Sequence, residues 1–418
     1  MPSGRNPEKK ACAGFASTLM SAHKLPSWKR STIGSSESFD LEAGVRLRQL
    51  SEMRKVLVFK ETLLPPSETF ILAQMRALSQ YVPMLAGLEH AHPSLPLPQE
   101  PILLSDRGRS ISDIRAKLYR RTGTAPRFHH NAKRSSPDLI HAHFASGGRT
   151  ALPLARALRV PLLVTLHGAD VTVRGPKLDN YRRLGEDASL FICVSQFIRD
   201  RALEAGFPAE KLLVHYIGID RDVFSPSRSP GRSQGVLFVG RLVEKKGCEY
   251  LVRAMQLVQQ AHPRCELTVI GDGPLRPSLE SLAGQLNVCC RFRGTQPEAA
   301  VREALRTAQI FCVPSVTAAN GDSEGLVMVF AEAQAMGVPV VSTAHGGIPE
   351  IVVNRVTGLL TPERDYEYLA NALSLLLGDQ DLWQQFHLAA LRHVERHFDL
   401  RTQTALLEKI YNETISAK

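Results

Sequence analysis

The stretch VLFVGRLVEKKGCEYLVRAMQLVQQ, residues 236–260, joins a short apolar run to a glycine-bearing loop and an amphipathic segment. Its first residues, 236–240, have the composition of a buried strand, and Leu251, Met255 and Val258 then repeat at helical spacing. Parallel strands need a crossover between them, and that crossover is usually a helix. The stretch therefore predicts one repeating unit of a parallel α/β sheet covered by helices.

The same unit recurs along the chain. Short apolar runs predict further strands at 56–59, 138–142, 161–166, 190–194, 266–271, 310–314 and 338–342. They form two series, which predicts two doubly wound Rossmann-like domains that face each other across a cleft. From about Leu382 the sequence turns helical again, and we expect this C-terminal segment to pack back onto the first domain.

Composition shifts predict where these parts begin and end. Before Met53 the chain lacks sustained periodicity, and residues 222–231 are rich in Pro, Ser and Gly. We also hypothesise that Met53 is the true initiator, which N-terminal sequencing of the native protein would test. The predicted division is a poorly ordered extension at 1–52, an N-terminal domain at 53–217, a linker at 218–235, a C-terminal domain at 236–385 and a helical segment at 386–418.

The composition limits the classes of protein. A chain of 418 residues that is 44% hydrophobic can bury more than one core. Its seven cysteines form neither a CxxC pair nor a spaced Cys/His set, so we expect no disulfide framework or zinc site, and a cytoplasmic location. No apolar stretch reaches about 18 residues, so the sequence predicts no membrane-spanning helix.

The formal net charge of +10 is concentrated in the first folded half of the chain, since residues 53–235 hold 26 Lys and Arg against 16 Asp and Glu. Many of these basic residues lie between residues 107 and 134. Such a cluster favours an anionic partner, either lipid headgroups, a lipid pyrophosphate or nucleic acid, and a merely solvated basic face is the alternative. Sparse aromatic residues argue against nucleic acid.

Glu324 and Glu332 are the two carboxylates of the apolar run SEGLVMVFAE, residues 323–332. On a helix their spacing corresponds to roughly 12 Å of rise, which is comparable to the distance between the two sugars of a nucleotide sugar. Each carboxylate can then accept hydrogen bonds from one sugar of the same ligand. The alternative is two solvent-facing glutamates on a core helix, and the pair alone does not decide between them.

Two loops of the C-terminal domain directly follow strands. In GRLVEKKG, residues 240–247, Arg241 and Lys246 can both reach one diphosphate, although basic residues are also common in surface loops. In GDGP, residues 271–274, Gly273 allows close backbone approach, but the third glycine of the dinucleotide fingerprint is missing. A Rossmann dehydrogenase is therefore disfavoured.

Three further segments allow both a binding and a structural interpretation. His167 follows a predicted strand, where a neutral imidazole can hydrogen-bond a sugar hydroxyl, but a lone histidine is more often structural. Glu68 is predicted in the first turn of a helix capped by Ser67, and it can also touch an acceptor hydroxyl. The glycines at 346–347 precede a predicted helix start, where backbone N–H groups either bind an anion or form a tight turn.

Taken together, these segments resemble the retaining glycosyltransferases of family 4, which have the GT-B fold, from about Met53 to the C-terminus. The resemblance rests on the EX7E pattern at Glu324 and Glu332, the GR-x4-KG loop, the GDGP turn and the segment HGAD at 167–170. The segments SETF, HAHF and LHGADVT, at 67–70, 141–144 and 166–172, are most similar to bacterial exopolysaccharide and colanic-acid-type transferases. The extension and the pair Val327-Met328 depart from the common pattern.

The resemblance implies a retaining, metal-independent hexosyltransferase. Its donor is a UDP- or GDP-linked hexose held by the C-terminal domain, and its acceptor is a lipid-linked or growing polysaccharide at the N-terminal domain and the inner membrane face. No cofactor is implied. The implied catalytic residues are Arg241, Lys246, Glu324 and His167, and the implied donor-binding residues are Arg241, Lys246, Gly273, Glu324, Gly325, Leu326, Val327 and Glu332.

In this family pattern Arg241 and Lys246 hold the diphosphate, Glu332 the ribose and Glu324 the transferred sugar, which His167 contacts from the other domain. The donor phosphate itself takes the acceptor proton, so stabilising the leaving group is the main task of the protein. Glu68 is the acceptor-side candidate.

Three features or classes of protein are alternatives to a metal-independent glycosyltransferase. Asp220-Arg221-Asp222 spells the DxD manganese motif of another glycosyltransferase fold, but it lies in the linker away from any strand end, so we expect no metal there. UDP-sugar 2-epimerases share the architecture but lack the combined GR-x4-KG and EX7E patterns. A non-catalytic nucleotide-sugar sensor or scaffold would bind donor without turnover.

Overall fold

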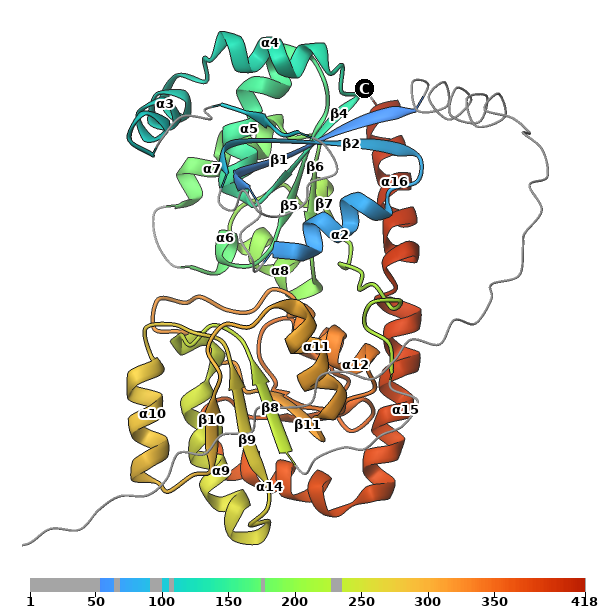
Figure 1. Ribbon diagram of the computed structural model, residues 1–418. Helices are drawn as coiled ribbons and strands as arrows, with labels where there is room; N and C mark the ends of the chain where they lie inside the picture. Colours follow the sequence, from blue (N-terminus) through green and yellow to red (C-terminus); the bar gives the residue numbers. More distant parts are fainter. Residues whose placement is uncertain are drawn as a thin grey trace, which may run out of the picture. The chain divides into compact units, whose positions relative to one another are not determined.

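The structure is a computed structural model that describes residues 53–63, 68–90, 100–104, 109–173, 177–226 and 235–417 (Figure 1). For residues 90, 109–113, 177–180 and 182 it describes the backbone alone. The predicted extension at 1–52, the predicted N-cap Ser67 and the linker residues 227–234 lie outside these ranges.

The first half of the described chain folds around a seven-stranded parallel sheet of order β3-β2-β1-β4-β5-β6-β7. Its strands are β1 (Arg54–Leu63), β2 (Tyr81–His90), β3 (Ile102–Leu103), β4 (Leu139–His143), β5 (Leu162–Leu166), β6 (Leu190–Cys193) and β7 (Leu212–Val214). The order changes direction between β1 and β4, and open α/β sheets bind ligands at the strand ends beside such a switch point.

The second half folds around a six-stranded parallel sheet of order β10-β9-β8-β11-β12-β13. Its strands are β8 (Gly235–Val239), β9 (Glu266–Ile270), β10 (Cys290–Phe292), β11 (Ile310–Val313), β12 (Val340–Thr343) and β13 (Gly358–Thr361). Here the switch point lies between β8 and β11. The two doubly wound α/β sheets confirm the predicted fold class.

Helices connect the strands of both sheets. In the first half they are α2 (Thr69–Ala77), α3 (Arg109–Thr122), α4 (Pro126–Arg134), α5 (Ala145–Leu158), α6 (Ala169–Thr172), α7 (Lys177–Asp187) and α8 (Gln196–Glu204). In the second half they are α9 (Cys248–Ala261), α10 (Arg276–Gln285), α11 (Glu298–Thr307), α12 (Met328–Ala335), α13 (Ile348–Ile351), α14 (Tyr366–Gly378), α15 (Gln380–His397) and α16 (Leu400–Ser416). Short 3-10 turns occur at 209–211 and 244–246.

The quoted stretch forms the predicted unit: β8, a loop and α9. The apolar repeat of α9 places Leu251, Met255 and Val258 in the core of the second sheet, where all three are fully buried. This burial explains why the helical spacing was informative, because an amphipathic helix gains its stability mainly from the face it packs.

The last two helices belong to different cores. Trp383 and Phe386 of α15 pack into the core of the second sheet, whereas Leu407 and Tyr411 of α16 pack among buried residues of the first sheet. Figure 1 shows α16 beside α2, and the two helices are in contact. The prediction that a C-terminal helix packs back onto the N-terminal domain is confirmed.

Five observed strands were not predicted from the sequence, and their residues explain why. β2 contains Pro83 and few β-branched residues, so it does not resemble a strand, although it pairs with the whole length of β1. β3, β7 and β10 are only two or three residues long, too short for any periodicity. β13 begins at a glycine and carries a single β-branched residue, Thr361.

None of the helices within the described ranges is both long and apolar enough to span a bilayer.

Candidate functional site

The loop 240–247 between β8 and α9 presents two predicted site residues in different ways. Gly247 adopts φ +63°, and a Cβ atom at this position would lie 1.8 Å from the carbonyl oxygen of Pro314, so the loop requires glycine there. Arg241 is exposed, whereas the side chain of Lys246 is only 16% exposed. Of these two residues, Arg241 faces solvent, whereas Lys246 points inward.

The GDGP turn after β9 lies directly against this loop. The N–H of Leu242 donates to the carbonyl oxygen of Asp272 at 2.9 Å. A Cβ atom on Gly273 would come within 2.5 Å of the Leu242 carbonyl oxygen. Gly273 therefore lies at the backbone of the loop that carries Arg241 and Lys246.

Glu324 is buried and is paired with Lys246. Its carboxylate accepts a hydrogen bond from Ser315 at 3.1 Å and forms an ion pair with Lys246 at 2.8 Å, while Lys245 Nζ lies 3.9 Å away. Lys245 is held in turn by Asp322 at 3.0 Å. Burial alone would raise the pKa of the Glu324 carboxyl, but the two lysines hold that pKa below its usual value.

The helical spacing that was used to relate Glu324 to Glu332 is wrong. Helix α12 begins at Met328, so Glu324 and the backbone of residues 325–327 precede the helix, and only Glu332 lies within it. The reason is the bend at Gly325, whose backbone packs against the carbonyl group of His167 in the loop after β5. The distance between the two carboxylates cannot therefore be taken from helical rise.

Glu332 lies in the middle of α12 and is half-buried. Burial, with a smaller contribution from the negative charge of Glu298 at the start of α11, raises the pKa of the Glu332 carboxyl to about 7. A carboxyl group with this pKa changes charge near neutral pH.

His167 follows β5 and lies within a group of aromatic rings. Its Nε2 is 3.0 Å from Nδ1 of His143, and its ring centroid is 4.5 Å from that of Phe144 and 5.4 Å from that of Phe70. Burial, assisted by the nearby positive charge of Lys60, lowers the pKa of the His167 imidazole to about 3. His167 is therefore a neutral imidazole at physiological pH.

The loop that carries His167 meets the loop that carries Glu324. A Cβ atom on Gly325 would lie 1.9 Å from the His167 carbonyl oxygen, so the two backbones are in direct contact. The hydroxyl of Thr172 also accepts a hydrogen bond from the N–H of Ser323 at 3.3 Å. Asp170 fixes the first loop, because its carboxylate accepts from the N–H of His167. The structure thus brings together the HGAD segment and the start of the EX7E segment.

Glu68 directly precedes α2 instead of lying in its first turn, and its side chain is engaged by a residue that the sequence did not single out. Lys60 of β1 forms an ion pair with Glu68 at 2.8 Å and lies 4.1 Å from the ring centroid of Phe144. Burial raises the pKa of the Glu68 carboxyl, and Lys60 partly opposes this shift. Phe144 has φ +67°, a conformation that costs energy in a non-glycine residue and often marks functional sites.

The glycines at 346–347 form a tight turn against the Glu324 segment. The N–H of Gly347 donates to the Glu324 carbonyl oxygen at 3.0 Å, and a Cβ atom on Gly347 would lie 1.9 Å from the Gly325 carbonyl oxygen. Of the two interpretations for these glycines, the structure favours the turn.

The DxD sequence in the linker takes part in local contacts. The carboxylate of Asp220 accepts hydrogen bonds from the N–H groups of Asp222 and Val223, and Asp222 pairs with Arg401 at 2.6 Å. Across the part of the chain that the structure describes, no three His, Cys, Asp or Glu residues are grouped so that they could hold a metal ion.

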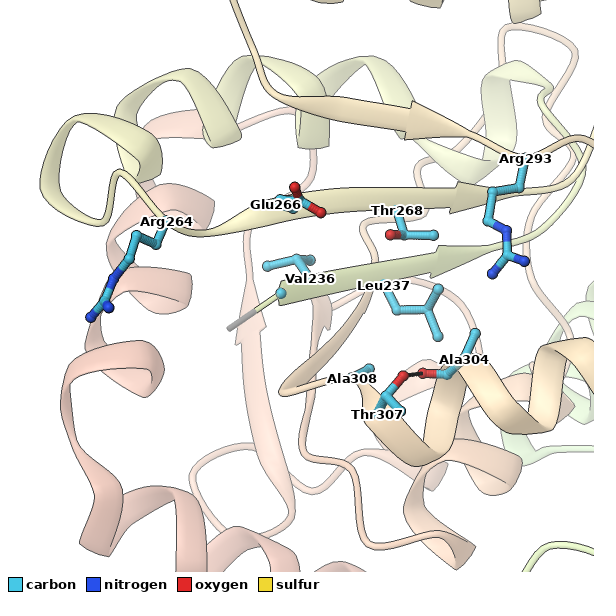
Figure 2. A pocket seen from close by; sticks show the side chains of 10 residues that line it. Val236, Leu237, Arg264, Glu266, Thr268, Arg293, Ala304, Thr307 and Ala308 are labelled. Atoms are coloured by element: carbon cyan, nitrogen blue, oxygen red, sulfur yellow. Dashed lines mark hydrogen bonds between the residues drawn. The ribbon is translucent and has the colours of Figure 1, made fainter. Parts of the chain in front are cut away.

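An open pocket of about 410 Å³ lies elsewhere on the second sheet, between β8, β9 and α11 (Figure 2). Arg264 lies near one end of it and Arg293 near the other, with Thr268 between them. None of the site residues predicted from the sequence lines this pocket.

Comparison with known proteins identifies the class. The profile of group 1 glycosyl transferases matches residues 233–379, and that of glycosyltransferase family 4 matches residues 90–223. The chain is 33% identical over 294 residues to the amylovoran biosynthesis glycosyltransferase AmsK of Erwinia amylovora, which covers 67% of this chain and 72% of AmsK. The chain therefore belongs to the family 4, group 1 glycosyltransferases.

Two other similar proteins are a mannosyltransferase and a protein solved with a nucleotide and a sugar. A GDP-mannose-dependent alpha-(1-6)-phosphatidylinositol monomannoside mannosyltransferase of Mycolicibacterium smegmatis is 30% identical over 291 residues, covering 65% of this chain and 76% of that protein. The solved structure of Anabaena HepE in complex with UDP and glucose matches with a TM-score of 0.70 at 20% identity, covering 86% of this chain and all of HepE. At that identity the structural match supports the GT-B fold alone.

Proposed function

We propose that the protein is a retaining hexosyltransferase that moves a hexose from a UDP- or GDP-linked donor to a lipid-linked or growing polysaccharide in exopolysaccharide synthesis. The observation that carries the proposal is the ion pair between Lys246 and Glu324, next to the loop that carries His167. A partly buried cation beside a buried carboxylate offers partners for a diphosphate and for sugar hydroxyls.

In the proposed mechanism the donor diphosphate displaces Glu324 from Lys246. Arg241 closes on the same diphosphate from solvent, and both cations stabilise the charge that develops as the glycosidic bond breaks. The released Glu324 carboxylate accepts hydrogen bonds from the sugar, while Lys245 remains as its nearest cation. The acceptor hydroxyl attacks the anomeric carbon from the face that the phosphate leaves, and its proton passes to the leaving phosphate. The anomeric configuration is therefore kept.

Donor turnover followed by proton NMR tests the proposal. With an acceptor present, the protein should consume a UDP- or GDP-hexose and yield a glycoside with the anomeric configuration of the donor. Conversion of the donor to its 2-epimer without acceptor would instead identify an epimerase. A protein that binds donor and leaves it intact with every lipid-linked and oligosaccharide acceptor would be a sensor or scaffold.

Donor affinity should rise about tenfold between pH 6 and pH 8, because Glu332 has a pKa of about 7 and only its ionised form accepts hydrogen bonds from both ribose hydroxyls. Isothermal titration calorimetry across this range measures the effect. In Glu332→Gln the step should disappear, and in Glu298→Gln it should move to lower pH because a neighbouring negative charge is lost. A pH step that survives in Glu332→Gln would contradict the assignment of the ribose to Glu332.

We further propose that α3 and α4 bind an anionic membrane surface that presents the acceptor. Ile114 and Leu118 lie one turn apart on α3 and are 68% and 57% exposed. Exposed basic residues lie near them on the same helix and on the following helix α4: Arg115, Lys117 and Arg121 on α3, and Arg127, Lys133 and Arg134 on α4. Apolar side chains among basic ones suit the interface of a bilayer that carries anionic lipids.

Vesicle sedimentation tests this surface. The protein should bind phosphatidylglycerol vesicles more tightly than phosphatidylcholine vesicles, and salt should weaken the binding. The double variant Ile114→Asp with Leu118→Asp should bind at least about tenfold more weakly, since it removes two apolar anchors and adds two negative charges. Leu388→Asp, at a residue 45% exposed on α15, is the control. Equal binding of the double variant and the control would reject the surface.

A further inference from the structure

A histidine and a second carboxylate, His345 and Glu363, are joined to the backbone of Glu324 by hydrogen bonds. The backbone N–H of Glu324 donates to Nε2 of His345 at 3.1 Å, and Nδ1 of His345 lies 2.7 Å from a carboxylate oxygen of Glu363. His345 follows β12 and is only 2% exposed, and Glu363 follows β13. The three groups form a continuous chain of hydrogen bonds.

The chemistry of the donor groups fixes the direction of these hydrogen bonds. A backbone N–H can only donate, so Nε2 of His345 must carry a lone pair. In a neutral imidazole the proton is then on Nδ1, which donates to the Glu363 carboxylate. Glu363 thereby selects the one tautomer of His345 that can accept from Glu324.

Glu363 is itself held in place from more than one side. Its carboxylate accepts from the N–H of Thr317 at 2.8 Å and from the Thr317 hydroxyl at 3.2 Å, and Arg364 approaches it at 3.2 Å. Burial raises the pKa of the Glu363 carboxyl, but the hydrogen bonds from Thr317 and His345 outweigh burial and hold the pKa below its usual value. Glu363 is therefore an ionised, fixed acceptor for His345.

We propose that Glu363 and His345 are positioning residues that hold the Glu324 segment so that its carboxylate faces the transferred sugar. The inference rests on the proposed function, which gives Glu324 that contact. This segment has other supports as well. The N–H of Gly347 donates to the Glu324 carbonyl, Ser315 and Lys246 contact the Glu324 carboxylate, and Thr172 accepts from the N–H of Ser323. The imidazole is the contact that fixes the Glu324 amide.

NMR of the protein labelled with ¹⁵N-histidine tests the pair without any turnover. His345, assigned by its loss in His345→Asn, should show a protonated Nδ1 and an unprotonated Nε2, with slow exchange of the Nδ1 proton. Glu363→Gln keeps an oxygen that accepts from Nδ1 and should keep this tautomer, whereas Glu363→Ala should lose the slowly exchanging proton. A His345 protonated at Nε2 in the wild-type protein would overturn the proposal.

Kinetics and binding test the consequence for Glu324. Glu363→Ala should lower kcat about tenfold. It should also weaken the binding of the nucleotide sugar that the protein uses, UDP-glucose or GDP-mannose, more than the binding of UDP or GDP alone, because only the sugar contact is disturbed. Glu363→Gln should stay within about threefold of wild type. The control is Glu367→Ala, an exposed carboxylate at the start of α14, which should change neither value.

Two outcomes would overturn the positioning role. One is a wild-type kcat in Glu363→Ala, and the other is an equal loss of affinity for the nucleotide and the nucleotide sugar, which would indicate a general loss of structure. If no nucleotide sugar binds the wild-type protein, the proposed function fails, and the His345 tautomer still decides whether the hydrogen-bonded pair exists.

Discussion

Replacing Lys246 by alanine is expected to slow sugar transfer by about 100- to 1000-fold, because a cation that stabilises a leaving diphosphate contributes roughly 3 to 4 kcal/mol to the transition state. The side chain of Lys246 is only 16% exposed, and its Nζ lies 2.8 Å from the Glu324 carboxylate. Arg241→Ala should have a similar effect through its contact with the same diphosphate. Steady-state rates with saturating acceptor measure both variants.

A matched control is available on β10, a strand of the same sheet. Arg291 of β10 is 68% exposed and pairs with Glu266 at the surface, so Arg291→Ala should transfer sugar at the wild-type rate. Lys246→Ala also leaves the buried Glu324 carboxylate with Lys245 as its nearest cation, at 3.9 Å, so its fold should be checked by circular dichroism. Wild-type rates in both Lys246→Ala and Arg241→Ala would overturn the diphosphate assignment.

Replacing Glu408 by alanine is expected to destabilise the protein by about 3 kcal/mol. Glu408 of α16 is fully buried, and its carboxylate accepts from the N–H groups of Ser79 and Gln80, both at 2.6 Å, and from the Ser79 hydroxyl at 2.9 Å. Alanine leaves these donors buried without their partner, and each unsatisfied donor costs about 1 to 3 kcal/mol before relaxation and water entry reduce the total. Urea unfolding followed by circular dichroism measures the change.

The control for this prediction lies on the same helix. Glu413 is exposed, so Glu413→Ala should shift the unfolding midpoint little. Glu408→Gln should fall between the two, because its amide keeps one acceptor oxygen and turns a donor toward the others. If Glu408→Ala unfolds at the same urea concentration as Glu413→Ala, α16 is not held to the first sheet through this carboxylate.

The sequence predicted the parts of the fold whose signal is local. Buried parallel strands such as β5 and β8 are largely apolar runs. The loop after β5 carries His167 and the loop after β8 carries Arg241 and Lys246, so these residues lie at strand ends. β2 was missed because Pro83 hides a strand that is stabilised by pairing with β1. Pairing between strands that are distant in the sequence cannot be predicted from a short window of residues.

The sequence named candidate site residues one at a time but did not predict how they are connected. The pairing of Lys246 with Glu324 joins two loops that were given separate tasks, and the start of α12 at Met328 removed the helical spacing between the two glutamates. The chain from Glu324 through His345 to Glu363 was missed because its members come from three loops and carry no shared motif. Only the packing of those loops brings their polar atoms together.

A thermal-shift panel of UDP-, GDP- and ADP-hexoses, run on the wild type and on Lys246→Ala, tests most directly whether the loop of Lys246 and the Glu324 segment hold a nucleotide sugar. We expect at least one UDP- or GDP-hexose to raise the melting temperature of the wild type, and the same ligand to give a much smaller shift with Lys246→Ala. No shift with any donor, or an equal shift in both proteins, would contradict a nucleotide-sugar site built on Lys246.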